Sequence, residues 1–350
     1  MFGTDYLVVL SSCSSPACFN KKESIYKALT PHKGRQQKCT NYTSTKKMNL
    51  RNQLFIVVIA ISIIACQPSK KQTNTSTTQA KDAIKTENIV FTSEGIQLAG
   101  TLYTPAKPHA AVVLVHGSDS VPRMKKLATL LAKNNVLVFT YDKRGVGESG
   151  GIYAGPEVGT NNISRENLQL LAKDASAAVQ LIHSKNKDIP IGLFGASQAG
   201  WIIPMVANNN PFVEFMVLFS APTITTLEQL RFQFYTNGRT DFWEHTTEKE
   251  AREHLQNDPD RYQFEPTDPK EVLKTLSIPG LWLFGEKDIQ IPVKLCIEQI
   301  NTLKLEKKPF EYVLFPSLGH HTYQEEPIHI SLNWIKQQAV RTKNTLHTLD

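Results

Sequence analysis

From residue 89 onward the chain alternates between stretches typical of buried strands and stretches that are helical or irregular. This alternation restricts the folds that the chain can adopt. In chain order the strand stretches are NIVFTS, IQLAGTLYTP, HAAVVLVHGS, NVLVFTYD, PIGLFGA, FMVLFSA, PGLWLFGE and FEYVLFPS. Most are continuous apolar runs, typical of strands buried on both faces. The first two are predicted to form an antiparallel hairpin turning at Glu94-Gly95. The alternation predicts an α/β fold, with a mostly parallel central sheet flanked by helices.

Two of the intervening stretches have clear helical patterns. Residues 121–135 predict a helix with Pro122 near its first turn and with Leu127, Leu130 and Leu131 on one side. Residues 164–184 predict a second helix, opened by Ser164 and carrying an apolar stripe. The ligand site of such a fold lies at the carboxyl ends of the strands, so the polar residues there are the candidates for function.

The N-terminal part of the chain has the pattern of a leader. In residues 48–66 a basic Arg51 precedes a short apolar run, too short to span a bilayer comfortably, that ends directly before Cys66. This resembles the processing site of a bacterial lipoprotein, where the cysteine becomes lipid-modified; a plain secretory signal and a single transmembrane anchor are the alternatives. Residues 67–87 are rich in Ser, Thr, Gln and Lys and predict a flexible tether. Residues 1–47 are expected to be an unstructured upstream extension.

The net charge of +7 comes mainly from the upstream extension. Residues 1–47 contain eight Lys or Arg and two Asp or Glu, so the rest of the chain carries a charge of about +1. A near-neutral body does not predict nucleic acid as a partner. The one cysteine of the body, Cys296, falls on the apolar face of an expected helix, which predicts a buried thiol and no disulfide framework.

Two serines compete for the role of a catalytic nucleophile. Ser149 lies in GESGG, a literal match to G-x-S-x-G, but its surroundings are a glycine-rich loop with no helix behind it. Ser197 lies in GASQAG, where Ala199 replaces the last glycine, and this stretch follows an expected strand and opens an expected helix. A nucleophile on a strained turn needs the strand, the turn and the helix in that order. We therefore predict Ser197 as the nucleophile.

Three motifs together give the chain a specific resemblance to the α/β-hydrolases. LVHGS (114–118) resembles the strand end that supplies the family's oxyanion site, YDKRGVGES (141–149) its D-x-R-G-x-G-x-S loop, and GASQAG (195–200) its nucleophile turn. The resemblance covers roughly residues 88–340, so the hydrolase domain is expected at 88–345. The hairpin followed by AVVLVHGS resembles the branch of bacterial esterases and serine-peptidase-like hydrolases.

The resemblance implies a Ser-Asp-His triad in the order Ser, acid, His. Asp288, after the strand GLWLFG, has the expected place of the acid, with Glu286 as its competitor. The histidine should follow the last strand, where His320 comes directly after a glycine and His321 is the alternative. The triad is therefore predicted as Ser197, Asp288 and His320.

The remaining implied roles belong to the surroundings of the triad. The oxyanion would be held by the backbone N–H groups of Ser118 and Gln198, while Asp142 and Arg144 are expected to be structural. No pair of histidines has metal-ligand spacing with an acidic partner, so neither a metal site nor a cofactor is expected.

The stretch between LFSAP and PGLWLFG is far longer than one crossover helix needs, and it predicts a helical cap at about 223–277. Its aromatic residues could line an acyl pocket or form the cap's own core. They are Phe232, Phe234, Tyr235, Phe242 and Trp243.

The sequence thus predicts a serine hydrolase that cleaves carboxyl esters of a small-molecule acyl substrate. A serine peptidase or an acyltransferase with the same triad is the alternative, because all three pass through an acyl-enzyme. A further alternative is a non-catalytic binding module on the same scaffold. The intact triad argues against this alternative. The lipid anchor at Cys66 would place the enzyme on a membrane of the bacterial cell envelope, facing the periplasm or the surface.

Overall fold

The computed structural model describes residues 83–155, 162–257 and 265–347. The expected upstream extension, the signal peptide with Cys66 and most of the expected tether lie outside the described residues. Among the helices in the described ranges, none is both long enough and apolar enough to cross a membrane.

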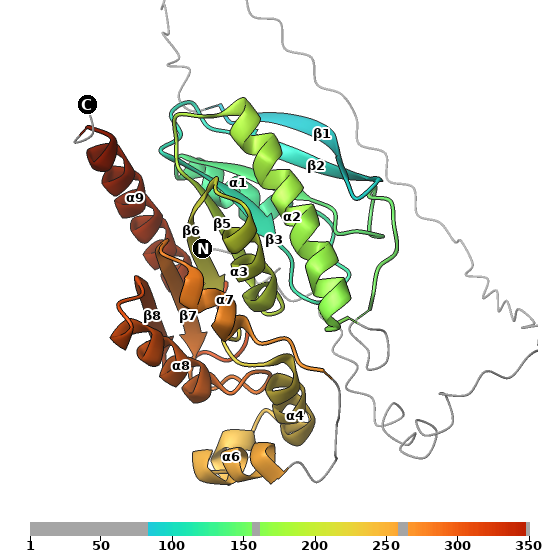
Figure 1. The fold of residues 1–350 in the computed structure, drawn as a ribbon, viewed down its shortest axis with the longest axis vertical. Coiled ribbons are helices and arrows are strands. Elements are labelled where there is room, and N and C mark those ends of the chain that lie inside the picture. The colour runs from blue at the N-terminus through green and yellow to red at the C-terminus, as the bar shows by residue number, and fades with distance from the viewer. Residues whose placement is uncertain (1–82, 156–161, 258–264, 348–350) are drawn as a thin grey trace, which may run out of the picture. The chain divides into compact units, whose positions relative to one another are not determined.

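The strands of the described chain form one sheet. They are β1 (Lys85–Ser93), β2 (Ile96–Thr104), β3 (Ala110–Val115), β4 (Val136–Tyr141), β5 (Ile191–Ala196), β6 (Val213–Phe219), β7 (Gly280–Gly285) and β8 (Phe310–Phe315). Their order is β1-β2-β4-β3-β5-β6-β7-β8 (Figure 1). β2 pairs antiparallel with β1 and β4, and all other pairs are parallel. The predicted mostly parallel sheet is confirmed.

Helices cover both faces of this sheet (Figure 1). They are α1 (Lys125–Lys133), α2 (Arg165–Lys185), α3 (Ala199–Asn209), α4 (Thr226–Thr236), α5 (Phe242–His245), α6 (Glu248–Asn257), α7 (Pro269–Thr275), α8 (Val293–Leu305) and α9 (Glu325–His347). α1 and α9 pack on one face with Val112 and Leu114 of β3. α2, α3, α7 and α8 pack on the other face with Val113 and Val115. Alternate residues of one strand thus enter two apolar layers, which explains the continuous apolar runs of the sequence.

The predicted hairpin is confirmed. Ser93 pairs with Ile96 across a two-residue turn, in which Glu94 has φ 48° and Gly95 has φ 73°. Two positive φ values in a two-residue loop match the twist of the strands on either side. β1 begins at Lys85, so its first residues lie inside the stretch expected to be a tether.

The first predicted helix is shorter than expected. α1 begins at Lys125, since Met124 already has non-helical backbone angles (φ −80°, ψ 65°). The N–H groups of Arg123 and Met124 just before the helix donate to the side chains of Asp142 (2.7 Å) and Thr140 (2.8 Å). Pro122 therefore precedes the helix. Of the three leucines predicted to share the apolar side, Leu131 is buried and Leu127 half-buried, but Leu130 is 41% exposed. Ala128 and Ala132 complete the buried side.

Two other local predictions are confirmed. The Ser164 side chain caps α2 by accepting a hydrogen bond from the N–H of Asn167. Cys296 is fully buried, and burial raises the pKa of its thiol to about 12.

The order of the strands places the functional end of the sheet. The chain passes from β3 outward to β4, then returns across β3 to β5. The loops that leave β3 and β5 therefore diverge at neighbouring carboxyl ends, which is where open α/β sheets bind ligands. These loops begin at His116 and Ser197.

Candidate active site

Ser197 occupies a strained turn between β5 and α3, with φ 53°. A side chain at Gly195 would come within 2.6 Å of the Ala199 Cβ and 2.8 Å of the Val115 carbonyl oxygen. A side chain at Gly200 would meet the carbonyl oxygen of Pro222 at 2.6 Å. These close contacts explain why the residues around the turn are small. The left-handed conformation of a non-glycine residue is costly, and such strain gathers at functional sites.

Ser149 has a structural environment. Its hydroxyl donates to the backbone carbonyl of Asp142 at 2.6 Å and accepts from the N–H of Ala99 at 3.0 Å. The residue is buried and lies in the turns after β4. The first bond closes the loop on itself and the second connects it to β2, so the literal motif match marks a structural serine.

Asp288 and His320 lie together at the carboxyl end of the sheet. The Asp288 Oδ2 is 2.8 Å from the His320 Nδ1. The other oxygen of Asp288 accepts from the N–H groups of Gln290 (2.7 Å) and Ile291 (3.0 Å). Asp288 is fully buried, whereas the competing Glu286 is exposed. This arrangement orients the imidazole and leaves its Nε2 for a substrate or a nucleophile.

His321 has a different environment. Its side chain is exposed, and its ring centroid lies 6.1 Å from that of His320. Partial removal from water and the neighbouring His320 lower the pKa of His321, while Asp288 and Asp119 act in the opposite direction.

The loop after β8 crosses toward the turn that carries Ser197. The Thr322 hydroxyl lies 3.0 Å from that of Ser220, which follows β6. The Tyr323 ring lies 4.6 Å from the Phe219 ring and 6.1 Å from the Phe194 ring, which belong to β6 and β5. The loop therefore runs from β8 over the ends of β6 and β5.

The hydroxyl of Ser197 makes no hydrogen bond to any residue in the described ranges. The structure thus brings Asp288 and His320 into contact, but the contact between Ser197 and His320 that proton transfer requires is not made. Catalytic hydrogen bonds of this kind often tighten only in the substrate complex.

The two predicted oxyanion residues lie beside Ser197. A side chain at Gly117 would be 3.6 Å from the Ser197 Cβ, so the chain leading into Ser118 passes close to the nucleophile. Gln198 directly follows Ser197 and is buried. Within the described part of the chain no acceptor takes the N–H of Ser118 or Gln198. Both donors are therefore available to an incoming oxygen.

Comparison with known proteins supports the fold. A family model described as serine aminopeptidase, S33 matches residues 106–269, a little under half of the chain; the match includes Ser197 and ends before Asp288. An esterase of Pyrococcus furiosus superposes with a TM-score of 0.53 at 15% identity, covering 74% of this chain and 91% of that one. An α/β-hydrolase of a Penicillium species superposes with a TM-score of 0.50 at 15% identity, covering 73% and 99%. No curated protein matches the chain in sequence.

The chain has the α/β-hydrolase fold. The strand order of the sheet and the helices on both of its faces agree with the predicted fold. In the described ranges no group of three His, Cys, Asp or Glu side chains gathers in an arrangement that could hold a metal ion.

Asp142 and Arg144, which were expected to be structural, make buried contacts that support this role. Asp142 accepts hydrogen bonds from the backbone and the side chain of Arg123 and from the N–H of Glu148. Burial alone would raise the pKa of Asp142, but these bonds lower it below its ordinary value. Arg144 binds Asp174 of α2 and the carbonyl oxygen of Ser93.

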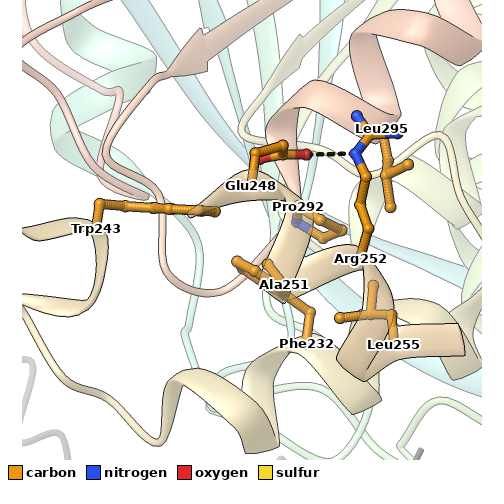
Figure 2. A pocket seen from close by; sticks show the side chains of 8 residues that line it. All are labelled: Phe232, Trp243, Glu248, Ala251, Arg252, Leu255, Pro292 and Leu295. Carbon is orange, nitrogen blue, oxygen red and sulfur yellow. Dashed lines mark hydrogen bonds and ion pairs between the residues drawn. The ribbon is translucent and has the colours of Figure 1, made fainter. Parts of the chain in front are cut away.

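The region predicted as the cap contains α4, α5 and α6, whose buried aromatic residues form a core of their own, whereas α7, at the end of that region, packs on the sheet. Phe232 and Phe242 are fully buried and meet edge to face, with Ala251 and Leu255 beside them. Figure 2 shows residues of α4 and α6 facing Pro292 and Leu295 at the start of α8. Of the two roles predicted for these aromatic residues, the cap's own core is the one that the contacts of Phe232 and Phe242 support.

Sequence reasoning missed the contacts that two residues, Lys143 and Trp243, make at the site. Lys143 is buried beside the predicted oxyanion residues, and the Trp243 indole donates to the backbone of Asp288. A signal for Lys143 was present, since a lysine directly after a buried strand and before a glycine-rich loop lies at the functional end of the sheet. No local pattern predicts the hydrogen bond of Trp243 to Asp288, because the two residues are distant in the sequence.

Proposed function

We propose that this α/β-hydrolase is a serine hydrolase that cleaves carboxyl esters through a triad of Ser197, Asp288 and His320. His320 would remove the proton of the Ser197 hydroxyl as that oxygen attacks the acyl carbon. Asp288 would hold the imidazole in place and stabilise the imidazolium. His320 would then give the proton to the leaving alcohol, and water would release the acyl group in the same way.

The observation that carries this proposal is the 2.8 Å contact between Asp288 and His320 at the same end of the sheet as the strained turn of Ser197. A buried carboxylate on the Nδ1 of a histidine is the arrangement that a histidine general base requires. The free N–H groups of Ser118 and Gln198 support their role as donors to the oxyanion. Such donors are typically worth about 3 kcal/mol each in the transition state.

A serine peptidase that uses the same triad is the second candidate, supported by the family model described as serine aminopeptidase. The first candidate, ester hydrolysis, is supported by the shared fold of the Pyrococcus furiosus esterase. Acyl transfer to an acceptor other than water would use the same acyl-enzyme. Rates on a panel of p-nitrophenyl esters and aminoacyl anilides separate these activities.

Labelling with a fluorophosphonate probe tests the nucleophile. We expect the wild-type protein to be labelled and Ser197→Ala to be unlabelled and inactive. Ser149→Ala is the matched control: it should remain labelled and keep most activity, although it loses two buried hydrogen bonds. Labelling that survives Ser197→Ala would contradict the assignment.

We also propose that Cys66 is lipid-modified and attaches the enzyme to a membrane of the bacterial cell envelope. The support is the sequence pattern of residues 48–66 alone. In this arrangement residues 67–82 would connect the anchor to the hydrolase domain.

A further inference from the structure

Lys143 is a buried lysine in the loop after β4, with 3% of its surface exposed. No carboxylate in the described part of the chain forms an ion pair with it. Burying an ammonium without a partner costs several kcal/mol. A lysine in such a place therefore needs an explanation.

The acceptors of Lys143 are all at the predicted oxyanion site. Its Nζ donates to the carbonyl oxygen of Gly117 at 2.7 Å, to that of Ser118 at 3.2 Å and to the Gln198 Oε1 at 3.1 Å. One ammonium group thus joins the loop after β3 to the turn after β5. These are the two segments that supply the N–H groups of Ser118 and Gln198.

The contact to Gly117 also acts on a donor directly. The Gly117 carbonyl and the Ser118 N–H belong to the same peptide group. A cation on the oxygen of a peptide polarises its N–H and makes it a stronger donor, as in cooperative chains of hydrogen bonds. Such polarisation has most effect where water is excluded.

Neighbouring groups hold the lysine in place. The Tyr153 hydroxyl donates to the same Ser118 carbonyl at 2.7 Å, and the Tyr153 ring lies 5.3 Å from the Lys143 Nζ. The Gln198 amide donates to Asn162 at 2.9 and 2.8 Å, which fixes its oxygen toward the lysine.

We propose that Lys143 is a positioning residue that holds the two halves of the oxyanion site together and strengthens their donors with its charge. This inference rests on the proposed function, since it assumes that Ser118 and Gln198 bind the oxyanion. It assigns Lys143 a role only in the transition state, when the charge on the substrate oxygen develops.

The charge of Lys143 depends on pH. Burial lowers the pKa of Lys143 to about 8, and Asp119 acts in the opposite direction. His116, which also faces Lys143, is neutral near pH 7, because burial lowers the pKa of this histidine to about 3. Lys143 is therefore cationic below about pH 8 and loses its charge as the pH rises through that value.

The test compares Lys143→Met and Lys143→Arg with Lys133→Met, an exposed lysine of α1, as the control. For Lys143→Met we expect kcat on a p-nitrophenyl ester to fall about 10- to 100-fold with little change in KM, since misplacing a transition-state donor costs about this much. The wild-type kcat should fall as the pH rises through about 8. Lys143→Arg should keep its activity to higher pH, because a guanidinium stays charged.

Binding of an alkylboronic acid gives a readout apart from turnover. The Ser197 oxygen adds to boron, its proton passes to His320, and the resulting tetrahedral anion presents an oxygen to the oxyanion site. We expect Lys143→Met to weaken this binding about as much as it lowers kcat. Thermal unfolding checks the fold of each variant, and the wild-type pH profile decides the matter even if Lys143→Met does not fold.

The proposal is overturned if folded Lys143→Met keeps the wild-type kcat and boronate affinity, or if the wild-type kcat does not fall through pH 8 to 9. These results are distinct from a failure of the proposed function. If the proposed function fails, the wild-type protein itself shows neither Ser197-dependent labelling nor boronate binding.

Discussion

The indole N–H of Trp243 donates a hydrogen bond to the backbone carbonyl of Asp288 at 2.8 Å. Trp243 belongs to α5 of the cap, and Asp288 holds His320. Two more cap side chains donate to the next two carbonyls: Thr236 to Ile289 at 2.6 Å and Gln229 to Gln290 at 3.0 Å. The cap thus supports the backbone of the acid loop residue by residue.

We expect Trp243→Phe to lower kcat by about 3- to 10-fold. The ring keeps its packing on Phe232 and Phe242, but one hydrogen bond to the acid loop is lost, a change of about 1 kcal/mol. Steady-state kinetics on a p-nitrophenyl ester measure the effect.

Trp334→Phe is the matched control, because it also removes an indole N–H, which lies 3.4 Å from Glu311 and away from the site. Its kcat should equal that of the wild type. Equal effects of the two substitutions would mean that the Trp243 bond does not orient the acid.

The neighbouring histidines should differ sharply in their effect on turnover. His320→Ala removes the group in contact with Asp288, and we expect kcat to fall on the order of 10³-fold or more. His321→Ala should lower kcat by less than about tenfold, since that side chain is exposed. Kinetics of both variants check this; the reverse pattern would move the general base to His321.

The ion pair of Arg123 and Asp142 should stabilise the fold. Both side chains are buried, with 6% and 3% exposed, so Arg123→Met leaves an uncompensated carboxylate. We expect the free energy of unfolding to drop by about 3–5 kcal/mol. Arg165→Met, which breaks the exposed pair with Glu265, should change it by less than about 1 kcal/mol. Denaturant titrations measure both values.

The cost of Arg123→Met should depend on pH. The pKa of Asp142 is lower in the folded protein than its ordinary value, so the stabilisation is present at neutral pH. It is lost as the pH falls below about 4, where the unfolded state takes up the proton first. The difference in stability between wild type and variant should therefore shrink in acid; a constant difference would mean that packing, not charge, is responsible.

The lipid anchor is tested by the intact mass of the mature protein. We expect a chain that begins at Cys66 and carries added acyl mass. The acyl chains would hold the protein on the membrane, because each buried CH₂ contributes about 0.8 kcal/mol to attachment. Cys66→Ser should accumulate as an uncleaved precursor. A different first residue, or no added mass, would indicate an ordinary signal or anchor instead.

The elements of the fold were predictable because their signals are local. The apolar runs of β3 and β5, the Glu94-Gly95 turn and the Ser164 cap each depend on neighbouring residues. The small residues around Ser197 are equally local, since the strained turn itself requires them. For the same reason Ser149 could be set aside by its context although its motif is literal.

The tertiary structure decided what depends on contacts between distant residues. α1 begins later than expected, and the two residues before it are held by the distant side chains of Asp142 and Thr140, which accept their N–H groups. Lys143 meets acceptors 26 and 55 residues away, and Trp243 meets Asp288 across 45 residues. Periodicity and spacing report which way a side chain faces within its own element. They do not report which loops the sheet brings to one edge, and that arrangement determines where a buried charge or an indole finds its partner.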